Sequence, residues 1–227
     1  MGGIEDYETD VIPTTAGDLA VTCLGHGSLL FTWQGQRIYV DPHGRVADYR
    51  ALPKADLVLI THEHSDHLDP QALAAVRTAS TRIVASELAQ AQIGAGTVMR
   101  NGDKATVGGL PIHAVPAYNL LHKRENGQPF HPKGVGNGYV LEFGDLRVYV
   151  AGDTEDVPDM SDLGAIDVAF LPANLPYTMS IDMVVEAARK VRPPIVYPYH
   201  FGKTDTAALK RRLESEVGCE ARIRRLA

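Results

Sequence analysis

The chain has 227 residues, a formal net charge of −6, 44% hydrophobic residues and 22% charged residues. This composition is ordinary for a globular protein, and a chain of this length can bury a sizeable core without disulfides or structural metals. Its two cysteines, Cys23 and Cys219, are too few and too far apart for a disulfide framework or a cysteine-based zinc site. The acidic balance argues against nucleic acid as a partner, because basic residues gather only near the C-terminus.

No stretch approaches the roughly 20 apolar residues of a membrane-spanning helix. The acidic N-terminal residues also lack the apolar run of a signal peptide. We therefore expect a cytoplasmic protein with no membrane span. The basic residues near 210–212 and 222–225 are interpreted as a solvated helix face and a charged edge strand. The sequence leaves open whether the chain forms a homo-oligomer.

Short β-prone runs follow residues 1–18, which are expected to be an N-terminal extension that can be flexible. Four strands are predicted in the first third, at 19–24, 28–33, 37–40 and 56–61. The last of these is a continuous apolar run, which is typical of a buried strand. Asp69 and Pro70 suit the N-cap and the first position of a helix, so we expect a helix from 70 to about 77.

Strand and helix signals then alternate to the end of the chain. The predicted strands are 82–85, 107–116, 139–143, 146–151, 166–171, 195–199 and 220–225, and the predicted helices are 86–92, 181–191 and 206–217. Residues 117–138 form a polar loop of a length that is usually functional or disordered. No linker of biased composition divides the chain, so we predict one domain over 1–227, with helices covering the outer sheet faces.

The segment 61–67 carries the chemistry that the sequence predicts. It places His62, His64, Asp66 and His67 directly after a buried strand and before a capped helix. Alternate side chains of an extended segment share a face, so His62 and His64 can point at one metal ion. The turn into the helix lets Asp66 and His67 face a second ion. Neutral imidazole and carboxylate suit zinc, and also manganese or iron.

Two further strands end at residues of ligand type. The run 148–154 is a buried strand followed by Gly152 and Asp153, and the run 198–201 is a strand that ends at His200. Taken alone, Asp153 could cap a turn and His200 could be a packed core residue. The ligands of α/β proteins bind at strand ends. Together with the motif at 61–67, this favours a metal-ligand role for both Asp153 and His200.

The runs ITHEHSDHLDP, AGDT and PYHFG, in this order, resemble the metallo-β-lactamase superfamily. The similarity extends from about Leu19 to the last helix. The segments GHGSLLF, YVDP, VPAYN, HPKG and 177–179 resemble its branch of metal-dependent hydrolases. That branch is similar to the ascorbate-6-phosphate lactonases and the N-acyl-phosphatidylethanolamine phospholipase D group. The resemblance implies an α/β fold, the four-layer αββα sandwich, with the site between two sheets.

The resemblance also implies two divalent metal ions, with zinc first and manganese or iron as alternatives. The implied ligands are His62 and His64 for the first ion, Asp66, His67 and His200 for the second, and Asp153 as a bridge. The superfamily usually adds a third histidine to the first ion from the loop after a central strand, where this sequence has Asn119. The amide oxygen of Asn119 or the ring of His131 in the same loop is the expected third ligand. His113, on the preceding strand, is interpreted as a packed or surface residue.

Other residues are expected around this site. Asp41, at a strand end, can accept a hydrogen bond from a ligand histidine. His26 and His43 fall nearby, and a plain structural role is as compatible with the sequence as a functional one. The expected substrate wall is the long loop, with Tyr118, Asn119 and His131. The loop's cations, Lys123, Arg124 and Lys133, indicate an anionic substrate.

The chemistry implied by this set is hydrolysis of a small molecule, an anionic ester, lactone or phosphodiester, by metal-activated hydroxide. Asp66 and Asp153 are the expected catalytic carboxylates. One alternative is an iron-dependent redox enzyme on the same fold, although redox members of the superfamily tend to have glutamate where His64 stands. Another is a non-catalytic metal-binding module, which the complete set of ligand-type residues argues against.

Overall fold

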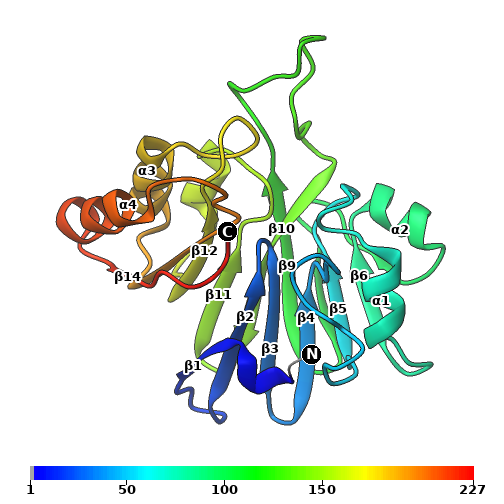
Figure 1. Ribbon diagram of the computed structural model, residues 1–227. Helices are drawn as coiled ribbons and strands as arrows, with labels where there is room; N and C mark the ends of the chain where they lie inside the picture. The colour runs from blue at the N-terminus through cyan, green and yellow to red at the C-terminus, as the bar shows by residue number, and fades with distance from the viewer. Residues whose placement is uncertain (1–2) are drawn as a thin grey trace.

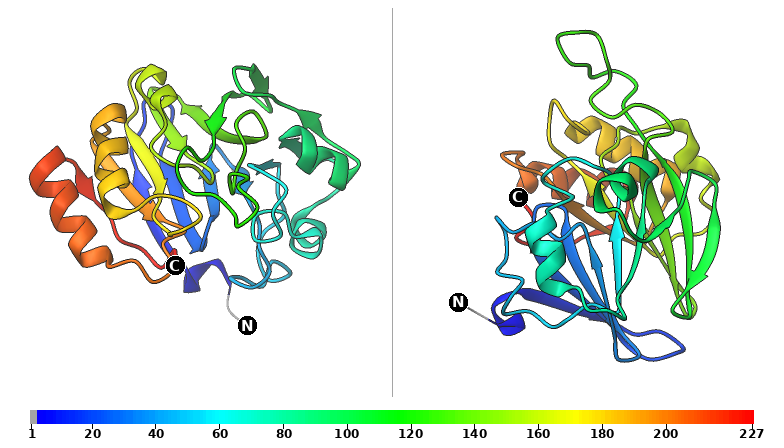
Figure 2. Two further views of the ribbon diagram at one scale, coloured as in Figure 1. Left: turned by 90° about the horizontal axis from the view of Figure 1, so that it is seen from above. Right: turned by 90° about the vertical axis from the view of Figure 1, so that its right-hand side faces the viewer.

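The computed structural model describes residues 3–227 as two seven-stranded β-sheets packed face to face, with helices on both outer faces (Figure 1). Helices α1 and α2 cover the first sheet, and α3 and α4 cover the second. Seen from above, the sheets lie between the two pairs of helices (Figure 2). This is the four-layer αββα sandwich that the sequence predicts.

The first half of the chain builds the first sheet. Its elements are β1 (Glu8–Ile12), β2 (Leu19–Gly25), β3 (Ser28–Trp33), β4 (Gln36–Val40), β5 (Leu57–Ile60), α1 (Pro70–Val76), β6 (Arg82–Ala85), α2 (Glu87–Ile93) and β7 (Thr97–Val98). Strands β1 to β4 form an antiparallel meander, whereas β4 to β7 are parallel neighbours.

The second half repeats this topology in the second sheet. Its elements are β8 (Lys104–Val107), β9 (Leu110–Ala117), β10 (Gly136–Phe143), β11 (Leu146–Val150), β12 (Val168–Pro172), α3 (Ile181–Val191), β13 (Ile195–Tyr199), α4 (Thr206–Arg212) and β14 (Glu220–Ala221). Strands β8 to β11 are antiparallel and β11 to β14 are parallel. The carboxyl ends of parallel strands lie at one edge of a sheet, so the residues after β5, β11 and β13 can meet there.

Several element boundaries differ from the sequence prediction. The segment 107–116 is not one strand, because Gly108 and Gly109 adopt φ of +62° and +86° and turn the chain between β8 and β9. Such a turn requires positive φ at both central residues, which glycine adopts without steric cost. The last helix is α-helical only to Arg212 and ends in a wider π-helical turn, Leu213–Val217. The final strand covers only Glu220–Ala221.

Strands β1 and β7 were not predicted. The first three residues of β1, Glu8, Thr9 and Asp10, are polar, so the segment lacks the apolar alternation that marks a half-buried strand in a sequence. Strand β7 has two residues, too few to form a pattern. Part of the expected N-terminal extension is therefore an edge strand paired with β2.

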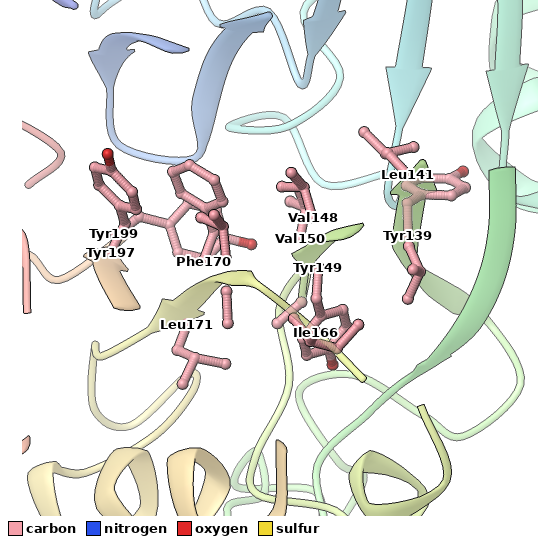
Figure 3. Close-up of a cluster of buried hydrophobic side chains, with 14 of the residues drawn as sticks. Tyr139, Leu141, Val148, Tyr149, Val150, Ile166, Phe170, Leu171, Tyr197 and Tyr199 are labelled. Carbon is pink, nitrogen blue, oxygen red and sulfur yellow. The ribbon is translucent and has the colours of Figure 1, made fainter. Parts of the chain in front are cut away.

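The core fills the space between the sheets and the space under each pair of helices. Phe31 of the first sheet lies 5.6 Å from Phe143 and 5.9 Å from Phe170 of the second, measured between ring centroids. Successive side chains of β12 point to opposite faces, so Phe170 points toward the first sheet and Leu171 toward the helices (Figure 3). Cys23 and Cys219 are buried and unpaired.

The helix starts follow the sequence prediction. The Asp69 carboxylate accepts hydrogen bonds from the backbone N–H groups of Gln71 and Ala72, and the Ser180 hydroxyl accepts one from that of Met183. Within residues 3–227, no helix has the length and apolar character needed to cross a membrane.

Candidate metal centre

Histidine and carboxylate side chains from both halves of the molecule meet at one edge of the two sheets. His62 to His67 follow β5, Asp153 follows β11 and His200 follows β13. His131 belongs to the loop between β9 and β10, residues 118–135, which projects beyond the sheets at the top of the view (Figure 1). The edge is the one expected from the parallel strand order.

The first group of donors contains His62, His64 and His131. His64 Nδ1 lies 3.1 Å from His62 Nε2 and 3.2 Å from His131 Nε2. His62 and His131 are buried and His64 is half-buried. The three ring nitrogens therefore converge on one point.

The second group contains His26, Asp66, His67 and His200. The Asp66 Oδ2 atom lies 3.1 Å from His26 Nε2, 3.5 Å from His200 Nε2 and 3.8 Å from His67 Nε2. His67 and His200 are buried, whereas 41% of the Asp66 side chain is exposed. This group is thus open to solvent on the side of Asp66.

Asp153 stands between the two groups. Its Oδ2 atom lies 3.3 Å from His131 Nε2, 3.9 Å from His62 Nε2 and 3.5 Å from His200 Nε2. Its Oδ1 atom lies 3.4 Å from His67 Nε2. One carboxylate therefore touches both sets of imidazoles.

Asp41 holds the His62–His67 segment through hydrogen bonds on the side away from the donor groups. Its Oδ2 atom accepts hydrogen bonds from His67 Nδ1 at 2.8 Å and from the Thr61 hydroxyl at 2.6 Å, and its Oδ1 atom accepts one from the Thr61 backbone N–H. Because His67 Nδ1 is engaged with this carboxylate, His67 Nε2 is the nitrogen that faces the site.

Asn119 does not join either group of donors. Its amide oxygen accepts hydrogen bonds from His131 Nδ1 at 2.7 Å and from the His131 backbone N–H at 2.9 Å. Its amide nitrogen donates to the Tyr177 carbonyl and to Glu155. The ring of His131, rather than the amide of Asn119, lies beside His62 and His64.

Glu155 is a residue of the site region that sequence reasoning missed. Its buried carboxylate accepts hydrogen bonds from the backbone N–H groups of residues 120, 121 and 122, from His122 Nδ1 and from Asn119. Burial opposes ionisation, but these hydrogen bonds hold the pKa of Glu155 below its usual range. The only sequence signal for a role of Glu155 was its position two residues after Asp153. The sequence does not show that Glu155 contacts the loop at residues 120–122, because that contact depends on the tertiary structure.

Other expected residues lie away from the donors. The Tyr118 hydroxyl donates to Asp159 at 2.7 Å, and Lys133 Nζ lies 4.6 Å from the Tyr118 ring centroid. His113 lies on β9 opposite Lys104 of β8. The loop cation Arg124 lies beside the donors, with Nη2 3.4 Å from His64 Nε2 and its guanidinium over the Phe130 ring.

The backbone is strained at three of these positions. His26, Asp41 and His200 have φ of +52°, +44° and +47°, in the left-handed region that non-glycine residues seldom adopt. Such outliers gather at functional sites, where the surrounding structure holds them.

The electrostatics of the site favour a cation. Burial opposes ionisation of Asp153, but attraction to His200 and His67 holds its pKa well below the usual range. Burial also opposes protonation of His67, yet the charges of Asp153 and Asp41 raise its pKa well above the usual value. Burial and neighbouring imidazoles lower the pKa of His62 and of His64, so both are neutral at pH 7. The anionic carboxylate of Asp153 therefore lies beside the neutral imidazole of His62.

The residues present fit divalent metal ions. His67 Nε2, His200 Nε2 and Asp153 Oδ1 are buried without a hydrogen-bond partner among residues 3–227, and the two imidazole nitrogens lie 3.4 and 3.5 Å from oxygens of Asp153. Buried polar atoms are rarely left unpaired. Imidazole nitrogens and carboxylate oxygens are the ligands that zinc, manganese and iron accept.

Comparisons with known proteins agree with this geometry. Residues 20–200 match the family model described as a beta-lactamase superfamily domain. The chain is 30% identical over 221 residues to the UPF0173 metal-dependent hydrolase MK1542 of Methanopyrus kandleri. This alignment covers 90% of this chain and 95% of that protein.

Two solved structures share the fold over nearly the whole chain. A crystal structure of a proposed metal-dependent hydrolase from Parabacteroides distasonis ATCC 8503 has a TM-score of 0.93 and 48% identity, and it covers 97% of this chain and 100% of that one. Igni18, a metallo hydrolase from Ignicoccus hospitalis, has a TM-score of 0.73 and 25% identity, covering 92% of this chain and 96% of that one. With a family match from residue 20 to residue 200 and relatives of this kind over nearly its full length, the protein belongs to the metallo-β-lactamase superfamily, among its metal-dependent hydrolases.

Proposed function

We propose that the protein holds two divalent metal ions and hydrolyses a small anionic ester, lactone or phosphodiester. The observation that carries the proposal is the position of Asp153, whose two oxygens lie 3.3–3.9 Å from imidazole nitrogens of both donor groups. The proposed ligands are His62, His64 and His131 for the first ion, Asp66, His67 and His200 for the second, and Asp153 for both. Zinc is the first candidate, with manganese and iron as alternatives.

Metal ions held by these donors would supply Lewis acidity, which lowers the pKa of water from about 15.7 toward roughly 7 and stabilises developing negative charge. Asp153 and Asp66 provide anionic oxygens at neutral pH. For Asp66, burial opposes ionisation, but the imidazoles of His200 and His26 hold its pKa below the usual range. The exposed face of Asp66 lets its carboxylate contact substrate.

Arg124 supports the anionic character of the substrate. Its guanidinium is exposed, packs over the Phe130 ring with 5.1 Å to the centroid, and lies beside His64. Lys133, by contrast, is engaged with Tyr118 and Asp159. A guanidinium can bind a carboxylate or phosphate through two parallel hydrogen bonds.

The first test is metal content. We expect two ions per chain by elemental analysis after chelation and reconstitution, and one ion or fewer in Asp153→Asn, because that variant removes the shared carboxylate. His113→Ala, a histidine outside both donor groups, is the control and should still bind two. A wild-type chain that binds fewer than two ions after reconstitution would refute the binuclear proposal, and iron alone in protein purified without added metal would favour redox chemistry.

The substrate class is tested with Arg124→Gln. Using an aryl phosphodiester as the probe, we expect KM to rise roughly tenfold with little change in kcat, since uniform binding of the anion is lost. Lys104→Gln, on the edge strand β8, is the matched control and should leave both constants unchanged. Equal loss of kcat and kcat/KM in Arg124→Gln would assign this residue to the chemical step instead. Absence of hydrolysis in fully metal-loaded protein across phosphodiesters, lactones and esters would favour a binding module.

A further inference from the structure

We propose that His26 is a fourth protein ligand of the second metal ion, in addition to Asp66, His67 and His200. This inference rests on the proposed binuclear site and extends it. The motifs that predict Asp66, His67 and His200 do not include His26. It lies in the segment GHGSLLF, more than thirty residues before Asp66, to which the sequence assigned no ligand.

The position of the His26 ring carries the inference. Its Nε2 atom lies 3.1 Å from Asp66 Oδ2 and within 4.8 Å of the ligand atoms of His67 and His200. Two donors that are each about 2.1 Å from one ion are separated by roughly 3.0–3.6 Å when they occupy neighbouring coordination positions. The 3.1 and 3.5 Å separations from Asp66 Oδ2 to His26 and His200 both fall in this range.

The backbone holds His26 in place for this role. The residue forms the turn between β2 and β3, and its carbonyl accepts a hydrogen bond from the His200 backbone N–H at 3.1 Å. The rings of His26 and His200 have centroids 3.7 Å apart. The turn of the first sheet is thereby attached directly to a ligand that follows β13 of the second.

The flanking glycines allow this close approach. A Cβ atom on Gly27 would lie 2.9 Å from His67 Cε1, and one on Gly25 would lie 2.7 Å from the Val46 Cβ. His26 itself has φ of +52°, a conformation that glycine adopts at lower cost. A histidine in a strained position between two glycines is explained by a use for its side chain.

The additional ligand changes the character of the second site. With Asp153, this site offers five protein donors, whereas the first offers three imidazoles and the shared carboxylate. Five donors exceed the tetrahedral set usual for structural zinc and suit ions that accept five or six ligands, such as manganese or iron.

The test uses His26→Gly, because glycine fits the left-handed backbone and should leave the metal-free fold intact. Manganese or cobalt is titrated by calorimetry into chelator-treated protein. We expect the first ion to bind with unchanged affinity and the affinity for the second to fall about 100-fold or more, beyond the 10–100-fold typical of residues that only support a ligand. His113→Ala is the control and should match wild type.

A second measurement separates coordination from a hydrogen bond to Asp66. In a crystal structure of the manganese-loaded wild type, we expect His26 Nε2 at bonding distance, about 2.2 Å from the ion. A distance beyond about 3 Å, or two ions bound equally well by His26→Gly and wild type, overturns the assignment of His26 and leaves the binuclear hydrolase standing. A wild-type chain that binds fewer than two ions overturns the binuclear proposal itself, and the role of His26 falls with it.

Discussion

Single residues behind the donors decide how firmly each imidazole is held. Asp41 and Asn119 occupy equivalent roles in the two groups, since each accepts a hydrogen bond from the Nδ1 atom of a histidine whose Nε2 faces the site. Such partners fix the tautomer and direction of the ring. The two residues therefore give separate control over the two proposed ions.

Asp41→Asn should weaken the second ion. The amide would place an N–H group against either the His67 ring or Thr61, both of which now donate to the carboxylate. We expect a 10–100-fold loss of affinity for one ion in a metal titration, and about 1–3 kcal/mol less stability in urea unfolding of the metal-free protein. Asp162→Asn, an exposed carboxylate, is the control. Wild-type affinity for both ions in Asp41→Asn would contradict this role.

Asn119→Ala should weaken the first ion instead. The substitution removes the acceptor for His131 Nδ1 and leaves the ring free to turn away from His62 and His64. We expect the affinity for one ion to fall 10–100-fold while the other is retained, as measured by calorimetric titration. Asn126→Ala, in the exposed part of the same loop, should bind both ions normally. If Asn119→Ala lost both ions equally, its effect would be on the fold of the loop rather than on His131.

At the scale of elements, the edge strand β1 is joined to the opposite sheet. Asp10 of β1 accepts hydrogen bonds from the Tyr197 hydroxyl of β13 and from Arg224 near the C-terminus. Two of the basic residues near the C-terminus form ion pairs within the protein: Arg222 with Glu220, and Lys210 with Glu214.

This contact predicts a pH-dependent stability. Burial opposes ionisation of Asp10, but hydrogen bonds from Arg224 and Tyr197 lower its pKa below the model-peptide value of 3.8. The carboxylate therefore stabilises the fold fully above about pH 4, and its contribution is lost as pH falls through the lowered pKa. Asp10→Asn should cost about 1–3 kcal/mol at pH 7.

The measurement is urea unfolding of chelator-treated wild type and Asp10→Asn from pH 7 to pH 2. The difference in unfolding free energy should shrink as pH falls below about 4, because the carboxylate of the unfolded chain takes up a proton first. It should reach a minimum once the native carboxylate is also protonated, below its lowered pKa. Asp18→Asn, an exposed residue of the turn before β2, should show no comparable difference. A constant difference at every pH would mean that the charge of Asp10 contributes nothing.

For the whole molecule, the candidate metal centre joins the two halves of the repeated fold. His62 to His67 come from the first half, whereas His131, Asp153 and His200 come from the second. Ligands that bind only the native state stabilise it by mass action, by about 2.7 kcal/mol at a free concentration of 100 times Kd. For a chain of this size, that gain raises Tm by roughly 5–10 °C for each ion.

Calorimetric scans of chelator-treated protein with added zinc or manganese check this expectation. Asp153→Asn should show a much smaller rise, since the carboxylate shared by both groups is gone. Metal that binds at full stoichiometry without raising Tm would show that the ions bind the unfolded chain equally well, which the buried donors of this site do not predict.

The sequence by itself determined the layered α/β fold and predicted most of the residues that the structure brings together in the two donor groups. Periodic apolar runs ending at His62, Asp153 and His200 are local signals, and strand ends in such folds meet at one edge. The caps at Asp69 and Ser180 are equally local. Patterns failed where an element is short or polar, as in β1 and β7, or where a glycine pair turns the chain, as between β8 and β9.

Only the tertiary structure decided which distant side chains share a site. His131 rather than Asn119 lies beside His64. Hydrogen bonds to Glu155 hold the loop between β9 and β10 in the conformation that places it there. His26 reaches Asp66 across 40 residues of sequence because a hairpin turn of one sheet packs against a strand end of the other. The sequence fixes which donor residues each loop contains, whereas the packing of the two sheets fixes which loops lie side by side.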